Sequence, residues 1–305
     1  MSSPIRFDDV HRRFGAREVL RGLSFRVEPG EVYALLGRNG AGKTTAMRIL
    51  LGFLAPMQGK SELLGSDSRA LTPELRARVG LVSEGHSLYG WMSVDDVLAF
   101  EAGTRRRFDL AKARAMRERL ALDPGAKVAA LSRGQRAQLA LLAAACGDPE
   151  VLVLDDPAMG LDPVVRRELL GVMIDLLADT GTSVLFSTHI LSDVERIADR
   201  VGILHEGRLI VDATLDDLKR RVEVRFVRGG TASELERVVP RCLRAAPRAG
   251  GHDLFLADVA DDTRRALASL AATERHGAVP SLEDLFVELT ADDRSPAPET
   301  AEVTR

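Results

Sequence analysis

The segment from Val32 to Leu54 constrains the fold of this chain more than any other. It reads VYALLGRNGAGKTTAMRILLGFL, an apolar run, a glycine-rich loop and then apolar residues at helical spacing. The loop, residues 37–44, matches G-x-x-x-x-G-K-[ST], a pattern that needs a strand before it and a helix after it. Glycines let backbone N–H groups converge on phosphates, and the helix N-terminus adds positive potential. The segment therefore predicts a nucleoside triphosphate site, against the alternative of a turn that only caps a helix.

The predicted contacts to the nucleotide are the residues of this loop and of the first helical turn: Gly37, Arg38, Asn39, Gly40, Ala41, Gly42, Lys43, Thr44 and Thr45. In this pattern the lysine reaches the β- and γ-phosphates as a point charge. The hydroxyl of the next residue, Thr44 here, can ligate Mg²⁺.

A second segment, VLVLDDP at 151–157, reads as a buried strand that ends in two carboxylates. We expect this strand to lie beside the strand that precedes the glycine-rich loop. That arrangement would bring Asp155 to the Mg²⁺ ion, which prefers oxygen ligands. Asp156 would then position or deprotonate the attacking water.

Strands and helices alternate along most of the chain, which predicts an α/β fold with a mixed or parallel sheet. Further strands are expected at 79–83 and 183–187, a helix at 163–178, and a helical insertion at about 85–145. We place this P-loop NTPase domain at residues 4–217.

The pattern changes after about residue 217. Two strand-like segments, VEVRFV and HDLFLADV, are separated by the helix-like ASELERVV and followed by DDTRRALASLAA. This predicts a small α+β accessory domain at 218–290. The polar, proline-bearing segment 291–305 predicts a disordered tail.

Composition excludes several classes of function. A net charge of −3 gives no electrostatic case for a nucleic-acid partner, and the short basic run at 105–107 is better explained as a solvated face. Two distant cysteines are typical of a reducing compartment. The longest apolar run, 139–146, is far shorter than the roughly 20 residues that span a bilayer. We expect a cytoplasmic protein that reaches a membrane only through a partner.

Six motifs in order resemble those of the nucleotide-binding subunits of ATP-binding cassette (ABC) transporters, over about residues 4–215. Besides the two segments above, they are Phe14 in RRFG, LSRGQ at 131–135, GLD at 160–162 and His189 in STH. The resemblance implies that ATP is the nucleotide and that Phe14 stacks on the adenine. It also implies that Asp162 belongs to the D-loop and that His189 bonds the γ-phosphate and the attacking water.

The LSRGQ segment resembles the family signature, which completes the nucleotide site of the opposite subunit. Its residues Ser132, Arg133, Gly134 and Gln135 begin a predicted helix, so a hydroxyl, a backbone N–H and the helix dipole can face an anion. In isolation, Ser132 reads as an ordinary N-cap. The resemblance implies a two-fold dimer, either a homodimer or a heterodimer, with two ATP molecules at the interface.

Two residues depart from the family pattern at the reaction centre. Asp156 stands where glutamate is usual, and Glu84 stands where glutamine is usual. The shorter side chain withdraws its carboxylate by roughly 1.3 Å, and a misplacement of about 1 Å can cost on the order of 10²-fold in rate. Glu84 adds a possible Mg²⁺ ligand. We expect slow hydrolysis through Asp156, with a subunit that binds ATP but scarcely cleaves it as the alternative.

The region after Glu84 carries Tyr89, Trp91 and Met92, and in the family it receives a coupling helix of an integral membrane permease. Trp91 could equally belong to the core of the helical region. The segment VPSLEDLFVELT at 279–290 resembles the end of ATPases paired with bacterial drug- and antibiotic-exporting permeases, and its spacing of Leu282, Leu285, Phe286 and Leu289 fits any docked helix. The leading hypothesis is an exporter ATPase on the inner face of the membrane. An importer ATPase and a regulatory subunit are the alternatives.

Overall fold

The computed structural model describes residues 2–105, 107–178, 180–257, 259–270, 273–274 and 282–290. The chain forms two compact units, residues 1–215 and 216–305. The division falls two residues before the boundary expected from the sequence. The predicted disordered tail, 291–305, lies outside the described residues.

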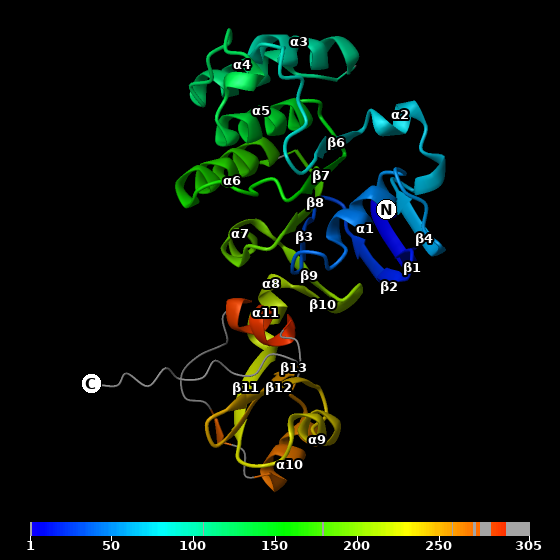
Figure 1. Ribbon diagram of the computed structural model, residues 1–305, viewed down its shortest axis with the longest axis vertical. Helices are drawn as coiled ribbons and strands as arrows, with labels where there is room; N and C mark the ends of the chain where they lie inside the picture. The colour runs from blue at the N-terminus through cyan, green and yellow to red at the C-terminus, as the bar shows by residue number, and fades with distance from the viewer. Residues whose placement is uncertain are drawn as a thin grey trace, which may run out of the picture. The chain divides into compact units, whose positions relative to one another are not determined.

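The first unit is built on a six-stranded sheet, seen in Figure 1. Its order is β10 (Arg208–Thr214), β9 (Arg200–His205), β3 (Val32–Leu36), β8 (Ser183–Thr188), β7 (Val151–Asp155) and β6 (Val79–Val82). Only β10 runs antiparallel to its neighbour. β7 and β8 are buried along their whole length, which explains why their sequences are continuous apolar runs rather than alternating ones.

The strand order corrects one expectation. β7, which ends in Asp155, does not lie beside the loop-bearing strand β3, because β8 lies between them. Strand order depends on long-range pairing and is not encoded in the local pattern of either strand. The helix α1 (Lys43–Leu50) nevertheless packs against β7, and the three strands end at one edge of the sheet.

Some helices of the first unit pack against this sheet, and others pack on one another. After α1 come α2 (Pro73–Arg76), α3 (Val94–Thr104), α4 (Leu110–Arg119), α5 (Arg133–Ala145), α6 (Pro163–Leu177) and α7 (Leu191–Ile197). α3, α4 and α5 contact one another and make the helical region expected at about 85–145 (Figure 1). α1 is shorter than the predicted helix because Gly52 takes a positive φ of 72° just after it.

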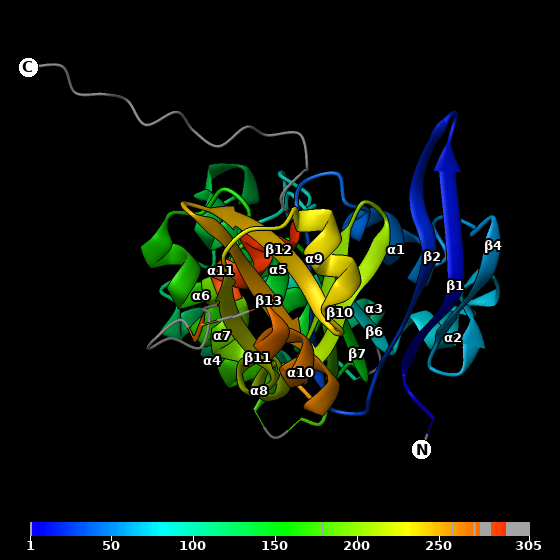
Figure 2. The same ribbon diagram turned by 90° about the horizontal axis from the view of Figure 1, so that it is seen from below.

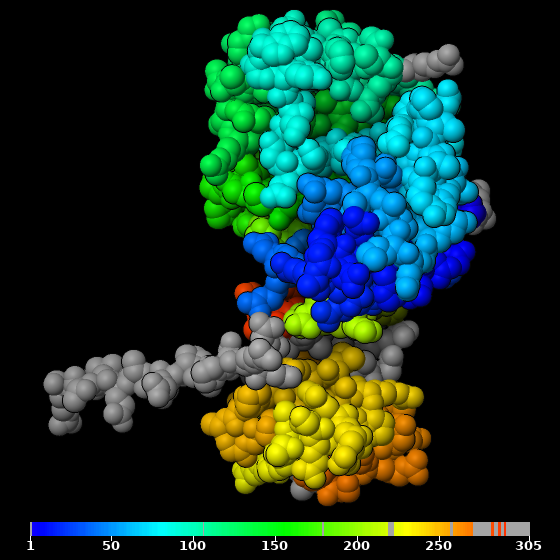
Figure 3. Space-filling model, turned by 45° about the vertical axis from the view of Figure 1, so that its right-hand side comes forward, coloured from blue at the N-terminus to red at the C-terminus, as the bar shows by residue number. Residues whose placement is uncertain are grey.

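A four-stranded antiparallel sheet completes the first unit, in the order β2 (Arg17–Val27), β1 (Ile5–Phe14), β4 (Gln58–Leu63) and β5 (Ser66–Asp67). Figures 2 and 3 show these strands and the neighbouring α2 segment, in blue and light blue. The two sheets share a core through a ring stack in which Phe25 lies 4.6 Å from Phe7 and 4.9 Å from Tyr33.

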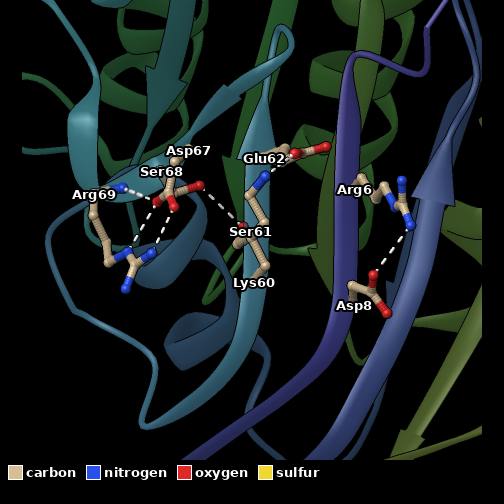
Figure 4. Close-up of polar contacts among 8 residues, drawn as sticks. All are labelled: Arg6, Asp8, Lys60, Ser61, Glu62, Asp67, Ser68 and Arg69. Atoms are coloured by element: carbon tan, nitrogen blue, oxygen red, sulfur yellow. Dashed lines mark hydrogen bonds and ion pairs between the residues drawn. The ribbon is translucent and has the colours of Figure 1, made fainter.

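The outer part of this sheet is held by local polar pairs, drawn in Figure 4. Asp67 accepts hydrogen bonds from the Arg69 side chain at 2.7 and 3.0 Å and from its backbone N–H at 2.8 Å. These bonds lower the pKa of Asp67 to about 2. Behind them, the Ser68 hydroxyl donates to Ser61 at 3.0 Å in a buried position.

The second unit begins with α8 (Leu215–Arg221) and then follows the order strand, helix, two strands, helix, strand. These are β11 (Val222–Val227), α9 (Ala232–Val238), β12 (Cys242–Arg248), β13 (Gly251–Ala257), α10 (Asp261–Ser269) and β14 (Thr273–Glu274). Their antiparallel sheet has the order β12-β13-β11-β14. This is the ferredoxin-like split βαβ arrangement.

This unit has its own core, formed between the sheet and the helices α9 and α10 (Figure 2). Leu254 and Leu256 of β13 pack there with Leu235 and Leu267. The strand β12 and the short β14 were not anticipated from the sequence. A final helix, α11 (Leu282–Thr290), buries Leu282 and Phe286, two of the residues whose spacing predicted a docked helix.

Candidate nucleotide site

The glycine-rich loop holds its lysine inside its own turn. Lys43 is 92% buried, and its Nζ donates to the Gly37 carbonyl at 2.6 Å and to the Arg38 carbonyl at 3.4 Å. Burial lowers the pKa of Lys43, while Asp156, Asp155 and Glu84 oppose that shift. An ammonium group held among backbone carbonyls and carboxylates can move to an anionic phosphate with little desolvation left to overcome.

Gly42 shows why the loop needs glycine. Its φ is +116°, and a Cβ at this position would lie 2.8 Å from Leu20 Cδ2 and 2.9 Å from the Val19 carbonyl oxygen. Any other residue would be strained in backbone and in space. Gly42 is also the N-cap of α1, whose first turn holds no acidic residue, so no side chain of the helix itself opposes the positive potential at its N-terminus.

An open cleft lies over this loop, with a volume of about 620 Å³, a size within the roughly 300–1,000 Å³ of ligand sites. Among the predicted site residues, its lining includes Phe14, Asn39, Gly40, Gly42, Lys43, Thr44, Thr45, Glu84, Asp155 and Asp156. Arg17, Val19 and Met159 also line it and were not anticipated. Gly37, Arg38 and Ala41 are not among the lining residues. Gly37 and Ala41 are buried, Arg38 is exposed, and the carbonyls of Gly37 and Arg38 hold Lys43.

Phe14 is well placed at the mouth of the cleft. Its ring is 47% exposed, and the Arg12 guanidinium lies 4.9 Å from the ring centroid. A large, exposed aromatic side chain at a polar cleft offers a flat face on which a base can stack.

Asp155 and Thr44 meet directly. The Thr44 hydroxyl donates to Asp155 Oδ1 at 3.1 Å, and the Ser187 hydroxyl donates to the same oxygen at 2.8 Å. Ser187 lies at the end of β8, so it spans the gap that the strand order leaves between the loop and β7. Ser187 was not predicted from the sequence, although it is the first residue of the STH motif that contains His189.

Asp156 is held by a different set of partners. Its backbone N–H donates to Ser187 Oγ at 2.9 Å, and its Oδ2 lies 2.9 Å from His189 Nδ1. Its Oδ1 is buried without a hydrogen-bond partner among the described residues. The residue has a positive φ of 45°, a conformation that costs an L-residue about 1–3 kcal/mol and is common at functional sites.

These oxygens fit a Mg²⁺ ion. The Thr44 hydroxyl, the Asp155 carboxylate and the Glu84 carboxylate all face the cleft, and hard oxygen donors are what Mg²⁺ selects. In the described part of the chain, no three or more acidic, histidine or cysteine side chains gather closely enough to hold a metal by themselves. The donor set therefore suits an ion that takes few protein ligands and fills its shell with water and phosphate.

The predicted signature residues do not line this cleft. Ser132 is the N-cap of α5, where its Oγ accepts from the Gln135 N–H at 3.2 Å and Gln135 Oε1 accepts from the Ser132 N–H at 3.0 Å. The structure thus shows the capping box that the residues alone favour. Ser132 and Arg133 are exposed.

Gly134 has a packing role in this helix. A Cβ at this position would lie 2.2 Å from Val165 Cγ1, so glycine lets α5 approach α6 closely. Asp162 is the N-cap of α6 and accepts from the N–H groups of Val164 at 3.0 Å and Val165 at 3.1 Å.

An exposed aromatic cluster lies on the helical region. Trp91 is 70% exposed, Tyr89 59% and Phe100 46%, and the Tyr89 ring lies 5.9 Å from Trp91 and 6.4 Å from Phe100. The alternative that Trp91 fills the helical core is therefore wrong. Met92, in contrast, is buried.

The fold and the cleft define a P-loop NTPase with a helical insertion, and comparison with known proteins gives the family. Residues 20–159 match the family described as ABC transporter. The bacitracin transport ATP-binding protein BcrA of Bacillus licheniformis is 32% identical over 226 residues, which cover 72% of this chain and 73% of that protein. The chain belongs to the ATP-binding proteins of ABC transporters, so it binds ATP and is a transport-coupled ATPase.

Two relatives match almost end to end. The Nod factor export ATP-binding protein I of Rhizobium etli is 34% identical over 94% of this chain and 93% of its own. The daunorubicin resistance ATP-binding protein DrrA3 of Streptomyces coeruleorubidus is 34% identical over 95% of this chain and 96% of its own.

A solved structure described as the ATP binding subunit of an ABC transporter superposes with a TM-score of 0.63 at 30% identity, covering 72% of this chain and 92% of that one. The predicted family and fold class are thereby confirmed. None of the described helices is both long and apolar enough to cross a membrane.

Proposed function

We propose that this chain is the Mg²⁺-dependent ATPase subunit of an exporter, that it works as a dimer, and that it acts on a separate membrane permease from the cytoplasmic face. One observation carries the catalytic part of this proposal. Lys43, Thr44 and the two carboxylates Asp155 and Asp156 converge at one sheet edge, joined by Ser187.

The roles of these residues follow from their positions. Lys43 and the N–H groups of the loop bind the phosphates, and Thr44 and Asp155 would hold Mg²⁺, with Glu84 as a further candidate ligand. When bound, the ion neutralises charge that builds up on the phosphates. Oδ1 of Asp156, which has no hydrogen-bond partner among the residues that the structure describes, is the carboxylate oxygen left to accept a hydrogen bond from the attacking water.

His189 completes this centre. Because a carboxylate only accepts, the 2.9 Å contact with Asp156 Oδ2 requires that Nδ1 carry the proton. Donation from Nε2 to a γ-phosphate oxygen would then need a second proton on the ring, because Nδ1 already carries one. Asp156 thus both orients the water and holds the histidine that faces the phosphate.

The dimer is inferred from the signature residues, which do not line the nucleotide cleft of their own subunit. Ser132, Gly134 and Gln135 lie at the start of a 13-residue helix and do not line the cleft of their own chain. An exposed helix N-terminus offers N–H groups and positive potential to an anion on another molecule. A closed, head-to-tail pair would give each ATP a P-loop from one subunit and a signature helix from the other.

Export is proposed from the relatives, whose names specify bacitracin transport, Nod factor export and daunorubicin resistance. The permease contact is proposed at the cluster of Tyr89, Trp91 and Phe100, whose exposed rings suit an apolar helix face. An importer ATPase and a poorly hydrolysing regulatory subunit are the competing functions.

Steady-state ATP turnover of the purified chain tests the catalytic proposal. We expect Mg²⁺-dependent hydrolysis that Asp156→Asn lowers on the order of 10²-fold or more, while Asp156→Glu retains measurable activity. Lys43→Ala serves as the control that loses ATP binding. An Asn variant as fast as wild type would exclude Asp156 as the base, and a wild type without turnover would favour the regulatory subunit.

Oligomeric state tests the dimer. We expect the Asp156→Asn variant to dimerise with ATP and Mg²⁺, and Ser132→Arg to block this dimer without weakening binding of ATP to the monomer. A chain that stays monomeric with bound ATP, even when its permease is supplied, would contradict the proposal.

A further inference from the structure

His86 lies in a short loop that links two functional regions of the first unit. The loop, residues 83–88, follows β6, presents Glu84 to the cleft and leads to the exposed rings of Tyr89 and Trp91. His86 itself does not face the cleft. It is 94% buried, and it lines a separate, small cavity of about 110 Å³ together with residues of α3 and α5.

The imidazole of His86 contacts the backbone next to the proposed base. Its Nε2 lies 2.8 Å from the carbonyl oxygen of Pro157. Because a carbonyl only accepts, Nε2 must carry a proton and donate. Burial lowers the pKa of His86 and the hydrogen bond to Pro157 opposes that shift, but the donor role of Nε2 follows from the contact itself.

The backbone of the loop is shaped to place this ring. His86 has a positive φ of 53°, directly after Gly85 at 80°. Its own N–H donates to the Ser83 carbonyl at 3.0 Å, and its carbonyl accepts from the Leu88 N–H at 2.8 Å. A left-handed conformation at a residue other than glycine costs about 1–3 kcal/mol and persists where the surroundings hold it. The buried hydrogen bond to Pro157 is one such restraint.

The contact matters because of what Pro157 follows. Asp156 is also left-handed, and its N–H is held by Ser187 on the side of β8. Proline has no N–H, so the carbonyl is the one backbone polar group by which Pro157 can be held. The peptide that carries the Asp156 side chain is therefore fixed from two sides, by Ser187 before it and by His86 after it.

We infer that His86 is a positioning residue for ATP hydrolysis, which sets the carboxylate of Asp156 through the Pro157 carbonyl and ties it to the loop beneath the exposed aromatic cluster. This inference rests on the proposed role of Asp156 as the base. It gives a direct path of covalent and hydrogen bonds from the surface at Tyr89 and Trp91 to the reacting carboxylate, so a partner that moves the loop would change the rate.

Three substitutions separate the hydrogen bond from the backbone conformation. In His86→Gln, the amide nitrogen takes the place of Nε2 and can still donate to Pro157. In His86→Leu the donor is lost. In His86→Asn the residue favours positive φ, but its amide is too short to reach the carbonyl. The full-length chain is assayed for kcat and KM of ATP hydrolysis, with binding of a fluorescent ATP analogue and the unfolding temperature as controls.

We expect His86→Leu and His86→Asn to lower kcat by roughly 10- to 100-fold, because a displacement of about 1 Å at the base has that effect. KM and analogue binding should stay within about twofold, since neither variant touches the P-loop. His86→Gln should stay within about threefold of the wild-type kcat.

The inference is overturned if His86→Leu hydrolyses ATP like wild type, or if Asn restores kcat while Gln does not. If His86→Leu does not fold, the comparison of Gln with Asn decides the matter alone. Failure of the proposed function is distinguishable, because it would show as a wild-type chain without turnover or an Asp156→Asn variant with full turnover.

Discussion

Replacing Ser187 with alanine should affect both carboxylates of the site at once. Its hydroxyl donates to Asp155 Oδ1 at 2.8 Å and accepts from the Asp156 N–H at 2.9 Å. Ser187 has no exposed surface, so water cannot readily replace the missing oxygen. The substitution removes one of the two donors that hold Asp155 and leaves the Asp156 N–H unpaired.

The size of the effect follows from these two bonds. A hydrogen bond to a charged group contributes about 1.5–3 kcal/mol, and a buried donor left unpaired costs about 1–3 kcal/mol. Ser187→Ala should therefore lower the free energy of unfolding by about 2.5–6 kcal/mol. For a unit of this size, that corresponds to a fall of roughly 5–25 °C in unfolding temperature. Displacement of both carboxylates should lower kcat by at least about tenfold.

Ser183→Ala on the same strand is a matched control. Ser183 is 97% buried and accepts from the Gly30 N–H at 2.9 Å, but it lies at the far end of β8 from the carboxylates. Scanning calorimetry and ATP turnover should show a loss of stability in both variants and a loss of kcat in Ser187→Ala only. If the two variants have equal kcat, Ser187 does not position the two carboxylates.

Three further predictions concern packing and ionisation. Gly134→Ala should lower the free energy of unfolding by about 1–3 kcal/mol, because the added Cβ overpacks against Val165. Gly171→Ala in α6, where a Cβ meets no atom within 4 Å, should raise it by about 0.5–1 kcal/mol. Chemical denaturation measures both, and a Gly134→Ala variant as stable as wild type would show that α5 and α6 separate freely. The pKa of His86 is lowered in the folded chain, whereas in the unfolded chain it is about 6.5. Below pH 6.5 the unfolded chain therefore binds more protons than the folded chain. The stability contributed by the buried, neutral His86 is thus present above pH 6.5 and is lost as the pH falls. The stability gap between wild type and His86→Gln should therefore be larger at about pH 7.5 than at about pH 5.5, and an equal gap would contradict the burial of a neutral ring. Asp67 should titrate near pH 2 by NMR, and Arg69→Gln should return its pKa toward 3.8. The ionised Asp67 carboxylate stabilises the fold above pH 3.8, and this stabilisation is lost as the pH falls toward 2.

The parts of the molecule that could be predicted are those with strong local signals. The P-loop segment carries its own strand, turn and helix pattern, and the continuous apolar runs of β7 and β8 follow from burial on both faces. The carboxylates of Asp155 and Asp156 were likewise expected at the end of a buried strand near the loop, and the family resemblance implied that His189 lies at the γ-phosphate.

The missed elements have weak or interrupted patterns. The strand β1 is half polar and has register shifts against β2, which break the alternation that marks a strand. β12 contains alanines and Pro247, residue types that are depleted in strands. Pro247 is tolerated because β12 is an edge strand.

The contacts of Ser187 and of His86 join residues far apart in the sequence. Ser187 acts only because β8 lies between β3 and β7, and His86 reaches Pro157 only because β6 pairs with β7. No local sequence pattern predicts which strand lies between two others in a sheet. The contacts of Ser187 and His86 therefore become apparent only from the three-dimensional structure.

The last strand of the catalytic sheet, β10, ends at residue 214, and a separate core is built from the residues that follow. A break in the gene near this point would leave all three hydrogen-bonded sheets intact. Truncation after residue 215 would therefore remove the ferredoxin-like unit without cutting any strand of the P-loop unit.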